Sequence, residues 1–119
     1  MPSLAWMPVM RFAHEAEVEC ARALDGLGIR WAYEPHMFVL SRDASGRIRE
    51  AITPDFHLPD LQLYLEVTAM RQRHVTRKNR KLRRLHELHP EVRCYALYAR
   101  DRVRLTERLG EICTVTRAA

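Results

Sequence analysis

Two short stretches decide how this chain is expected to fold: ITPDFHLP at residues 52–59 and YLEVT at residues 64–68. In the second stretch and the residues just before it, apolar and polar side chains alternate, which is typical of a strand with two distinct faces. In the first, Pro54 cannot donate a ladder hydrogen bond and marks a bend at which Asp55 is displayed. One acid therefore ends an extended run, and a second acid, Glu66, lies inside the next strand.

The rest of the chain alternates between helical and extended patterns. Apolar residues recur every three or four positions from Phe12 to Leu27, and Gly28 follows as a terminator, which predicts a first helix. Further expected elements are extended runs at Ile29–Tyr33 and Met37–Leu40, a turn at Arg42–Gly46, a return strand at Ile48–Phe56, a strand at Leu61–Val67, a helix from Thr76 to His89, a strand at Val92–Ala99, a helix at Asp101–Leu109 closed by Gly110, and an edge strand at Ile112–Val115. The resulting order, α-β-β-β-α-β-α with that edge strand as an addition, predicts one α/β (α+β) domain over residues 1–119, with a central mixed sheet flanked by helices.

Composition narrows the class of protein. A chain of 119 residues with 47% apolar content suits one folded domain, and no apolar run approaches the length of a membrane span. The first residues lack the basic start and cleavage pattern of a secretory signal, so we expect a cytoplasmic protein with no membrane partner. Cys20, Cys94 and Cys113 are far apart and in apolar contexts, which favours structural thiols over a disulfide or a zinc site.

The positive charge is concentrated in one segment. The net charge is +5, and residues 71–84 hold eight lysines and arginines without one acid. This concentration of positive charge favours a surface that binds a polyanion over a basic surface that is simply exposed to solvent.

Asp55 and Glu66 have the chemistry of a divalent-metal site. Two carboxylates on adjacent strand ends can hold Mg²⁺ and leave positions for water and a phosphate oxygen. The alternatives are a turn residue after proline for Asp55 and a surface glutamate on an amphipathic strand for Glu66.

The ordered set of motifs resembles a known family. ITPDF with the later Glu66-Val67-Thr68 is similar to the motif of PD-(D/E)XK nucleases, the restriction-endonuclease-like superfamily, and most similar to small members such as phage-type Holliday-junction resolvases and very-short-patch-repair endonucleases. The likeness extends upstream to the first helix, with Glu17, Cys20, Ala21, Leu24 and Asp25, and then to Gly28, Trp31 and the segment Tyr33-Glu34-Pro35.

This resemblance implies a restriction-endonuclease-like fold and a metal-dependent DNA endonuclease using Mg²⁺ or Mn²⁺. By that resemblance, Asp55 and Glu66 are metal ligands and Glu17 is a third acid from the helix. Helical period alone places Glu17 at the margin of the buried stripe, and a solvated helix glutamate is the alternative. Glu34 can also approach the site, although a strand-end carboxylate paired with arginine is the preferred interpretation.

The chain departs from the family at Thr68, where active members carry lysine. Thr68 shares a strand face with Glu66, so its hydroxyl can position water, but it brings no positive charge. Lys78 lies on the apolar stripe of the second helix and can replace the missing cation. Alternatively, its stem packs at the helix edge while the ammonium reaches solvent or phosphate. Gln72 is a weaker candidate for orienting water or phosphate.

The remaining basic residues are candidate DNA-backbone contacts: Arg71, Arg73, Arg77, Arg80, Lys81 and Arg84. Such contacts carry no sequence information, so we expect structure-selective activity in repair, recombination or mobile-element metabolism. Cutting two strands with one small site favours a homodimer. The alternatives are a nuclease-fold binding module that has lost cleavage and, more distantly, a small regulator that binds RNA.

Overall fold

The structure is a computed structural model that describes the backbone of residues 15–68 and 72–118 and the side chains of residues 15–68 and 75–114. Its elements, in chain order, are α1 (Glu15–Gly26), β1 (Ala32–Tyr33), β2 (Phe38–Arg42), β3 (Ile48–Ile52), β4 (Phe56–Leu58), β5 (Leu63–Thr68), α2 (Gln72–Leu88), β6 (Cys94–Tyr98), the 3₁₀ helix η2 (Ala99–Arg104) and α3 (Leu105–Ala118). The predicted α+β class with a mixed sheet and three helices is confirmed. None of the described helices combines the length and the apolar character of a membrane span.

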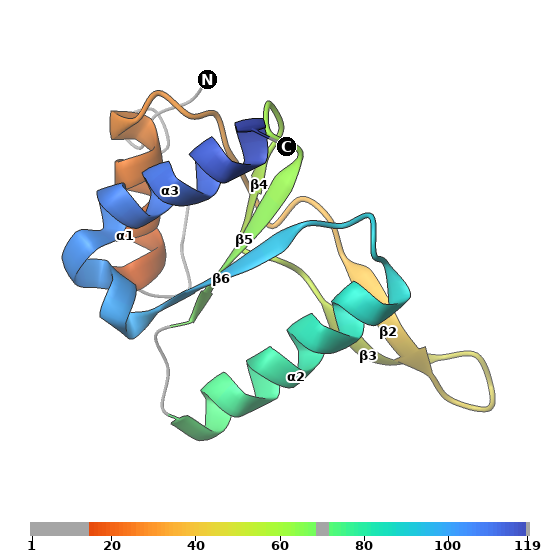
Figure 1. Ribbon diagram of the computed structural model, residues 1–119. Helices are drawn as coiled ribbons and strands as arrows, with labels where there is room; N and C mark the ends of the chain where they lie inside the picture. Colours follow the sequence, from red (N-terminus) through yellow and green to blue (C-terminus); the bar gives the residue numbers. More distant parts are fainter. Residues whose placement is uncertain (1–14, 69–71, 119) are drawn as a thin grey trace.

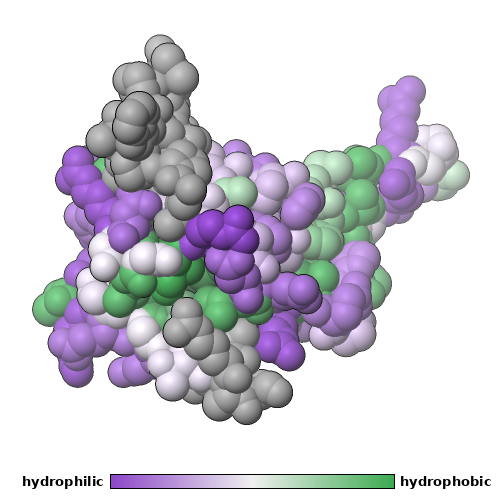
Figure 2. Space-filling view, turned by 90° about the horizontal axis from the view of Figure 1, so that it is seen from above, coloured by the Kyte–Doolittle hydropathy of each residue, from purple (hydrophilic) through white to green (hydrophobic). Residues whose placement is uncertain are grey.

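The main sheet has four strands in the order β1-β4-β5-β6. β4 pairs antiparallel with β1 and β5, whereas β6 pairs parallel with β5 after the crossover through α2. Figure 1 shows α1 and α3 on one side of this sheet and α2 on the other. β2 and β3 form a separate two-stranded sheet, which extends away from the body and carries hydrophilic residues at its far end (Figure 2).

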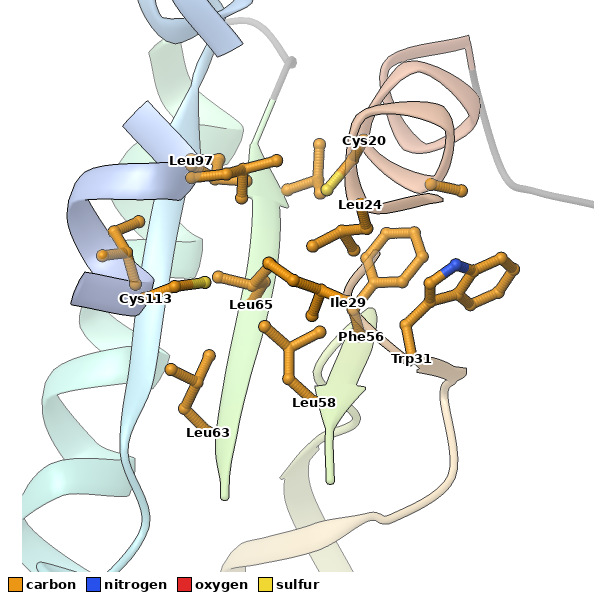
Figure 3. Packing of buried hydrophobic residues seen from close by; sticks show 14 of the residues in the cluster. Cys20, Leu24, Ile29, Trp31, Phe56, Leu58, Leu63, Leu65, Leu97 and Cys113 are labelled. Atoms are coloured by element: carbon orange, nitrogen blue, oxygen red, sulfur yellow. The ribbon is translucent and has the colours of Figure 1, made fainter. Parts of the chain in front are cut away.

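The alternation in β5 divides the protein into two apolar layers. Leu63, Leu65 and Val67 belong to the larger core under α1 and α3, where side chains from the sheet and both helices meet (Figure 3). The smaller core joins α2 to the β2–β3 hairpin through residues that include Leu40 and Leu85. Since side chains alternate along a strand, Glu66 and Thr68 lie on the α2 side of the sheet.

The predicted return strand at Ile48–Phe56 is wrong in its second half. β3 ends at Ile52, and Phe56 begins β4, which leaves the hairpin for the main sheet. Pro54 lies between them and cannot donate a ladder hydrogen bond, so the chain changes sheets there. The predicted order therefore has too few strands between the first two helices, where the structure has five.

Several predicted boundaries also move. The run Ile29–Tyr33 contributes only the short β1, and β5 begins at Leu63 instead of Leu61. Thr76 does not cap the second helix, because α2 already begins at Gln72. The beginning of the first predicted helix, at Phe12, lies outside the described residues.

The predicted helix end and edge strand near the C-terminus are both wrong. Gly110 does not close a helix, and no strand forms at Ile112–Val115, because α3 runs through both from Leu105 to Ala118. Ile112 and Cys113 are buried in the larger core. The packing that these side chains gain stabilises the helix beyond a residue of low helix propensity.

Replacing two of the glycines by alanine should change the free energy of unfolding in opposite directions. Apart from its chain neighbours and the adjacent backbone of its own helix, a Cβ at Gly110 would meet no atom within 4 Å, so Gly110→Ala should raise the free energy of unfolding by about 0.5–1 kcal/mol. Gly28 has a φ of 69° and follows α1, so Gly28→Ala should lower that free energy by about 1–2 kcal/mol, since L-residues are strained there. Urea denaturation of both variants is the measurement. Destabilisation by Gly110→Ala would contradict the open space seen at that position.

Candidate metal centre

Asp55 and Glu66 lie side by side because β4 and β5 are neighbours. Phe56 pairs with Leu65 in the antiparallel register, which brings the residue before β4 opposite Glu66. The backbone N–H of Asp55 donates to Glu66 Oε1 at 3.2 Å, and the N–H of Val67 donates to Asp55 Oδ2 at 2.7 Å. Both carboxylates are buried. The two acids singled out in the sequence thus form one linked pair.

Two more carboxylates approach Asp55 from α1 and from the end of β1. Carboxylate oxygens of Glu17, Glu34 and Asp55 all lie within 4.8 Å of one another. Glu17 is only 1% exposed and accepts a hydrogen bond from the Tyr33 hydroxyl, so it is not a solvated helix glutamate. Oxygen donors gathered at this spacing suit Mg²⁺ or Mn²⁺, and the residues present fit such an ion.

Glu34 is the acid that the sequence interpretation undervalued. Among the side chains described, no arginine lies within ion-pair distance of Glu34, so the preferred pairing with arginine is not found there. Instead, its backbone N–H donates to the Asp55 carbonyl at 2.9 Å, and its φ of 48° turns the chain at the end of β1. The adjacent Pro35, which disfavours helical backbone at the residue before it, was the only local sign of an irregular turn here.

Burial governs the protonation of Glu66. Desolvation, together with the neighbouring Asp55 carboxyl group, raises the pKa of Glu66 from 4.5 to about 9, although the positive charge of Lys78 opposes the shift. Without a cation between the carboxylates, Glu66 therefore holds a proton at neutral pH. A strongly shifted pKa beside a second carboxylate is typical of functional sites, which makes this pair a candidate for one.

This shift predicts a pH-dependent stability for the metal-free protein. The folded chain keeps the Glu66 proton up to about pH 9, whereas the unfolded chain loses it near pH 4.5. The unfolded state then binds fewer protons, so the free energy of unfolding should fall as the pH rises through this window, by at most about 1.4 kcal/mol per pH unit. Urea denaturation in EDTA at several pH values measures this. Glu66→Gln should flatten the dependence, whereas a change at the exposed Glu87 should not.

Lys78 reaches the acidic pair from α2. Its Nζ lies 3.6 Å from Glu66 Oε2 and donates to the Val67 carbonyl at 2.8 Å. Its side chain is about one-fifth exposed, so the stem does not carry the ammonium out to solvent. Of the two alternatives, the geometry matches the one in which the Lys78 ammonium reaches the acidic pair.

Thr68 has an unused hydroxyl. The residue is 1% exposed, and its Oγ1 has no hydrogen-bond partner among the residues that the structure describes. It lies two residues beyond Glu66 on the same face of β5, at the end of the strand. An unpaired buried hydroxyl is costly, and such a group beside a polar site is one that a water or ligand atom can satisfy.

The basic residues predicted to contact DNA differ in what they contact within the protein. Arg80 pairs with Glu50 of the hairpin and Lys81 donates to the Ala51 carbonyl, so both tie α2 to β3. Arg84 pairs with Glu87 on its own helix, while Arg77 is exposed. The side chains of Arg71, Gln72 and Arg73 lie outside those described. Only part of the predicted basic face is therefore placed, and two of its members also have a structural role.

All three cysteines are buried, as expected of structural thiols, and none forms a disulfide bond. Burial raises the pKa of the Cys20 and Cys94 thiols far above its ordinary value.

Comparison of the chain with protein-family models, curated proteins and solved structures found no match. What the site does is therefore inferred from its own geometry.

Proposed function

We propose that this protein is a metal-dependent DNA endonuclease with a restriction-endonuclease-like fold. The observation that carries the proposal is the position of Lys78, whose ammonium lies beside Glu66 in a cluster that also contains Asp55. Acids and a lysine in one site are what phosphodiester hydrolysis needs, and here the lysine comes from the helix instead of the strand. The arrangement of β4, β5, α2 and β6 around them agrees with that fold.

In this proposal Asp55, Glu66 and Glu17 hold Mg²⁺ or Mn²⁺, and Glu34 is added to the predicted set. The bound ion would supply a lowered pKa for water and neutralisation of phosphate charge. Lys78 stabilises negative charge that develops on the phosphate and helps to orient the attacking water. The hydroxyl of Thr68 forms a hydrogen bond with that water, as donor or as acceptor.

A binding module without cleavage is the second candidate. It is favoured by the hydrogen bond from Lys78 to the Val67 carbonyl, which occupies one of the three ammonium protons, and by Thr68 in the place of lysine. In that case the basic face would still bind DNA, but no substrate would be cut.

Lys78→Ala distinguishes the roles of this residue. Purified protein is incubated with branched, nicked and linear DNA in Mg²⁺ or Mn²⁺, and affinity is measured separately in EDTA. Loss of one group that stabilises charge in the transition state typically costs about 10²–10³ in rate, so the variant should cut at least about 100-fold more slowly while its affinity changes little.

Lys81→Ala is the matched control, because Lys81 has the same charge on the same helix but contacts the hairpin. It should keep the cleavage rate. If Lys78→Ala loses affinity and not rate, Lys78 is a phosphate contact only. If wild type binds every substrate and cuts none of them, the protein is the binding module.

A further inference from the structure

The free edge of β6 lies in a groove between α2 and α3. β6 is the last strand of the main sheet, and Figure 1 shows it passing between these two helices. The groove has a volume of about 590 Å³, within the range of small-ligand sites. We call it the edge groove; its polar lining includes Asn79, Arg83 and His86 of α2, Tyr95 and Tyr98 of β6, and Arg108 of α3.

The edge groove is positive. Its lining contains Arg83, Arg108 and His86, but no aspartate or glutamate. Arg83 has no ion-pair partner within the described part of the chain, and Arg108 has only a long contact with Glu111, at 3.4 Å. Two guanidinium groups on opposite walls, without acids between them, fit an anionic ligand with more than one charge.

The edge itself is poorly suited to an added peptide strand. The Cys94 carbonyl lies 3.2 Å from His86 Nε2, and the Tyr98 N–H donates to Asp101 Oδ2 at 2.7 Å. Strand addition needs a row of open backbone groups. Because side chains already occupy groups at both ends of β6, a ligand recognised by charge is favoured over one recognised by backbone pairing.

The groove adjoins the acidic cluster. In the parallel register of β5 and β6, Ala96 is the partner of Glu66 and Tyr98 is the partner of Thr68. Both Ala96 and Tyr98 line the groove. Neighbouring strands are about 4.8 Å apart, so a chain molecule lying in the groove would run beside the cluster, one strand away.

We infer that the edge groove binds a single, unpaired DNA strand, with phosphates on Arg83 and Arg108 and a base against the half-buried ring of Tyr95. A positive groove with an aromatic side chain is the usual way in which proteins hold a single strand. The inference deepens the proposed function by naming the form of the substrate, an unpaired strand next to the cut, and it rests on that function for the choice of DNA as the polyanion.

The test measures binding in EDTA, by fluorescence anisotropy, of a labelled single-stranded DNA of about 12 nucleotides and of the matching duplex. Wild type should prefer the single strand. Arg83→Glu should weaken single-strand binding at least about tenfold, and Arg83→Ala should reduce the salt dependence of log K by about 0.7, the value for one phosphate contact. Arg47→Glu is the control, since it makes the same change of charge at an exposed residue of the β2–β3 turn that does not line the groove, and it should change the affinity less than about twofold.

Equal losses from Arg83→Glu and Arg47→Glu would overturn the inference, because the attraction would then be diffuse. Equal affinity for duplex and single strand, or equal competition by poly-glutamate, would also overturn it. Arg83→Lys, which keeps the charge, should keep most of the affinity, and this guards against an unfolded variant. Binding is measured in EDTA and so does not depend on cleavage. If the protein binds single-stranded DNA as expected but does not cut DNA when Mg²⁺ or Mn²⁺ is added, only the proposed function is refuted. Cleavage that is unaffected by Arg83→Glu, with unchanged single-strand binding, refutes the groove alone.

Discussion

Asp55→Asn should reduce metal-dependent DNA cleavage by roughly a thousandfold. Asp55 is the acid shared by the pair with Glu66 and by the cluster with Glu17 and Glu34, so removing its charge weakens the cation site from both sides. Loss of about 4 kcal/mol of charge stabilisation in the transition state corresponds to that factor. The asparagine oxygen can still accept from the Val67 N–H, so the fold should be kept.

The measurement is the single-turnover rate on the best DNA substrate in Mg²⁺, together with calorimetric titration of Mg²⁺. Asp60→Asn is the matched control, because Asp60 is exposed and pairs with Arg30 away from the cluster. It should leave both the rate and the metal affinity unchanged. If Asp55→Asn cuts DNA at the wild-type rate, Asp55 is not a catalytic residue and the proposed function fails.

Phe56→Ala should lower the free energy of unfolding by about 3–5 kcal/mol, the usual cost of deleting a buried aromatic ring. Phe56 is fully buried, and its ring packs edge-on against Trp31 and Tyr33 at centroid distances of 5.5 and 5.6 Å. Such a loss is a large part of the roughly 5–15 kcal/mol that stabilises a typical domain. Urea denaturation followed by circular dichroism measures it.

Val103→Ala provides the comparison, since Val103 is 89% exposed. It should change the free energy of unfolding by less than about 0.5 kcal/mol. Phe56→Leu should have a free energy of unfolding between those of Phe56→Ala and Val103→Ala, because leucine keeps most of the apolar contact but loses the ring pairs. Equal stability of Phe56→Ala and wild type would mean that β4 is not held by this core.

The acidic cluster shows how far local pattern predicts a site. Alternation placed Glu66 and Thr68 on one face of a strand, and helical period placed Glu17 at the margin of the buried stripe of α1 and Lys78 on the apolar stripe of α2. Side-chain direction repeats every two residues in a strand and every 3.6 residues in a helix, so these positions can be predicted without knowing which other elements pack nearby. The resemblance added the expectation that the acids meet, and Asp55 and Glu66 are indeed linked.

Other features depended on partners distant in the chain. The approach of Glu34 to Glu17 and Asp55 required β1 to pair with β4, and a propensity for a turn gave no sign of that pairing. The use of Arg80 and Lys81 to hold the hairpin likewise depended on where β3 lies. In a sequence, a basic residue bound to its own protein looks the same as one that is free for DNA.

The sequence by itself determined the apolar faces, the turn at Gly46, the bend at Pro54 and the faces that carry the acids, because each follows from the geometry of a few consecutive residues. Only the tertiary structure decided that Phe56 leaves the hairpin for β5, that α3 continues through Gly110, and that the free edge of β6 lies in a positive groove. The physical reason is that burial outweighs local preference. A helix or strand extends wherever packing against distant side chains gains more free energy than the local backbone preference costs.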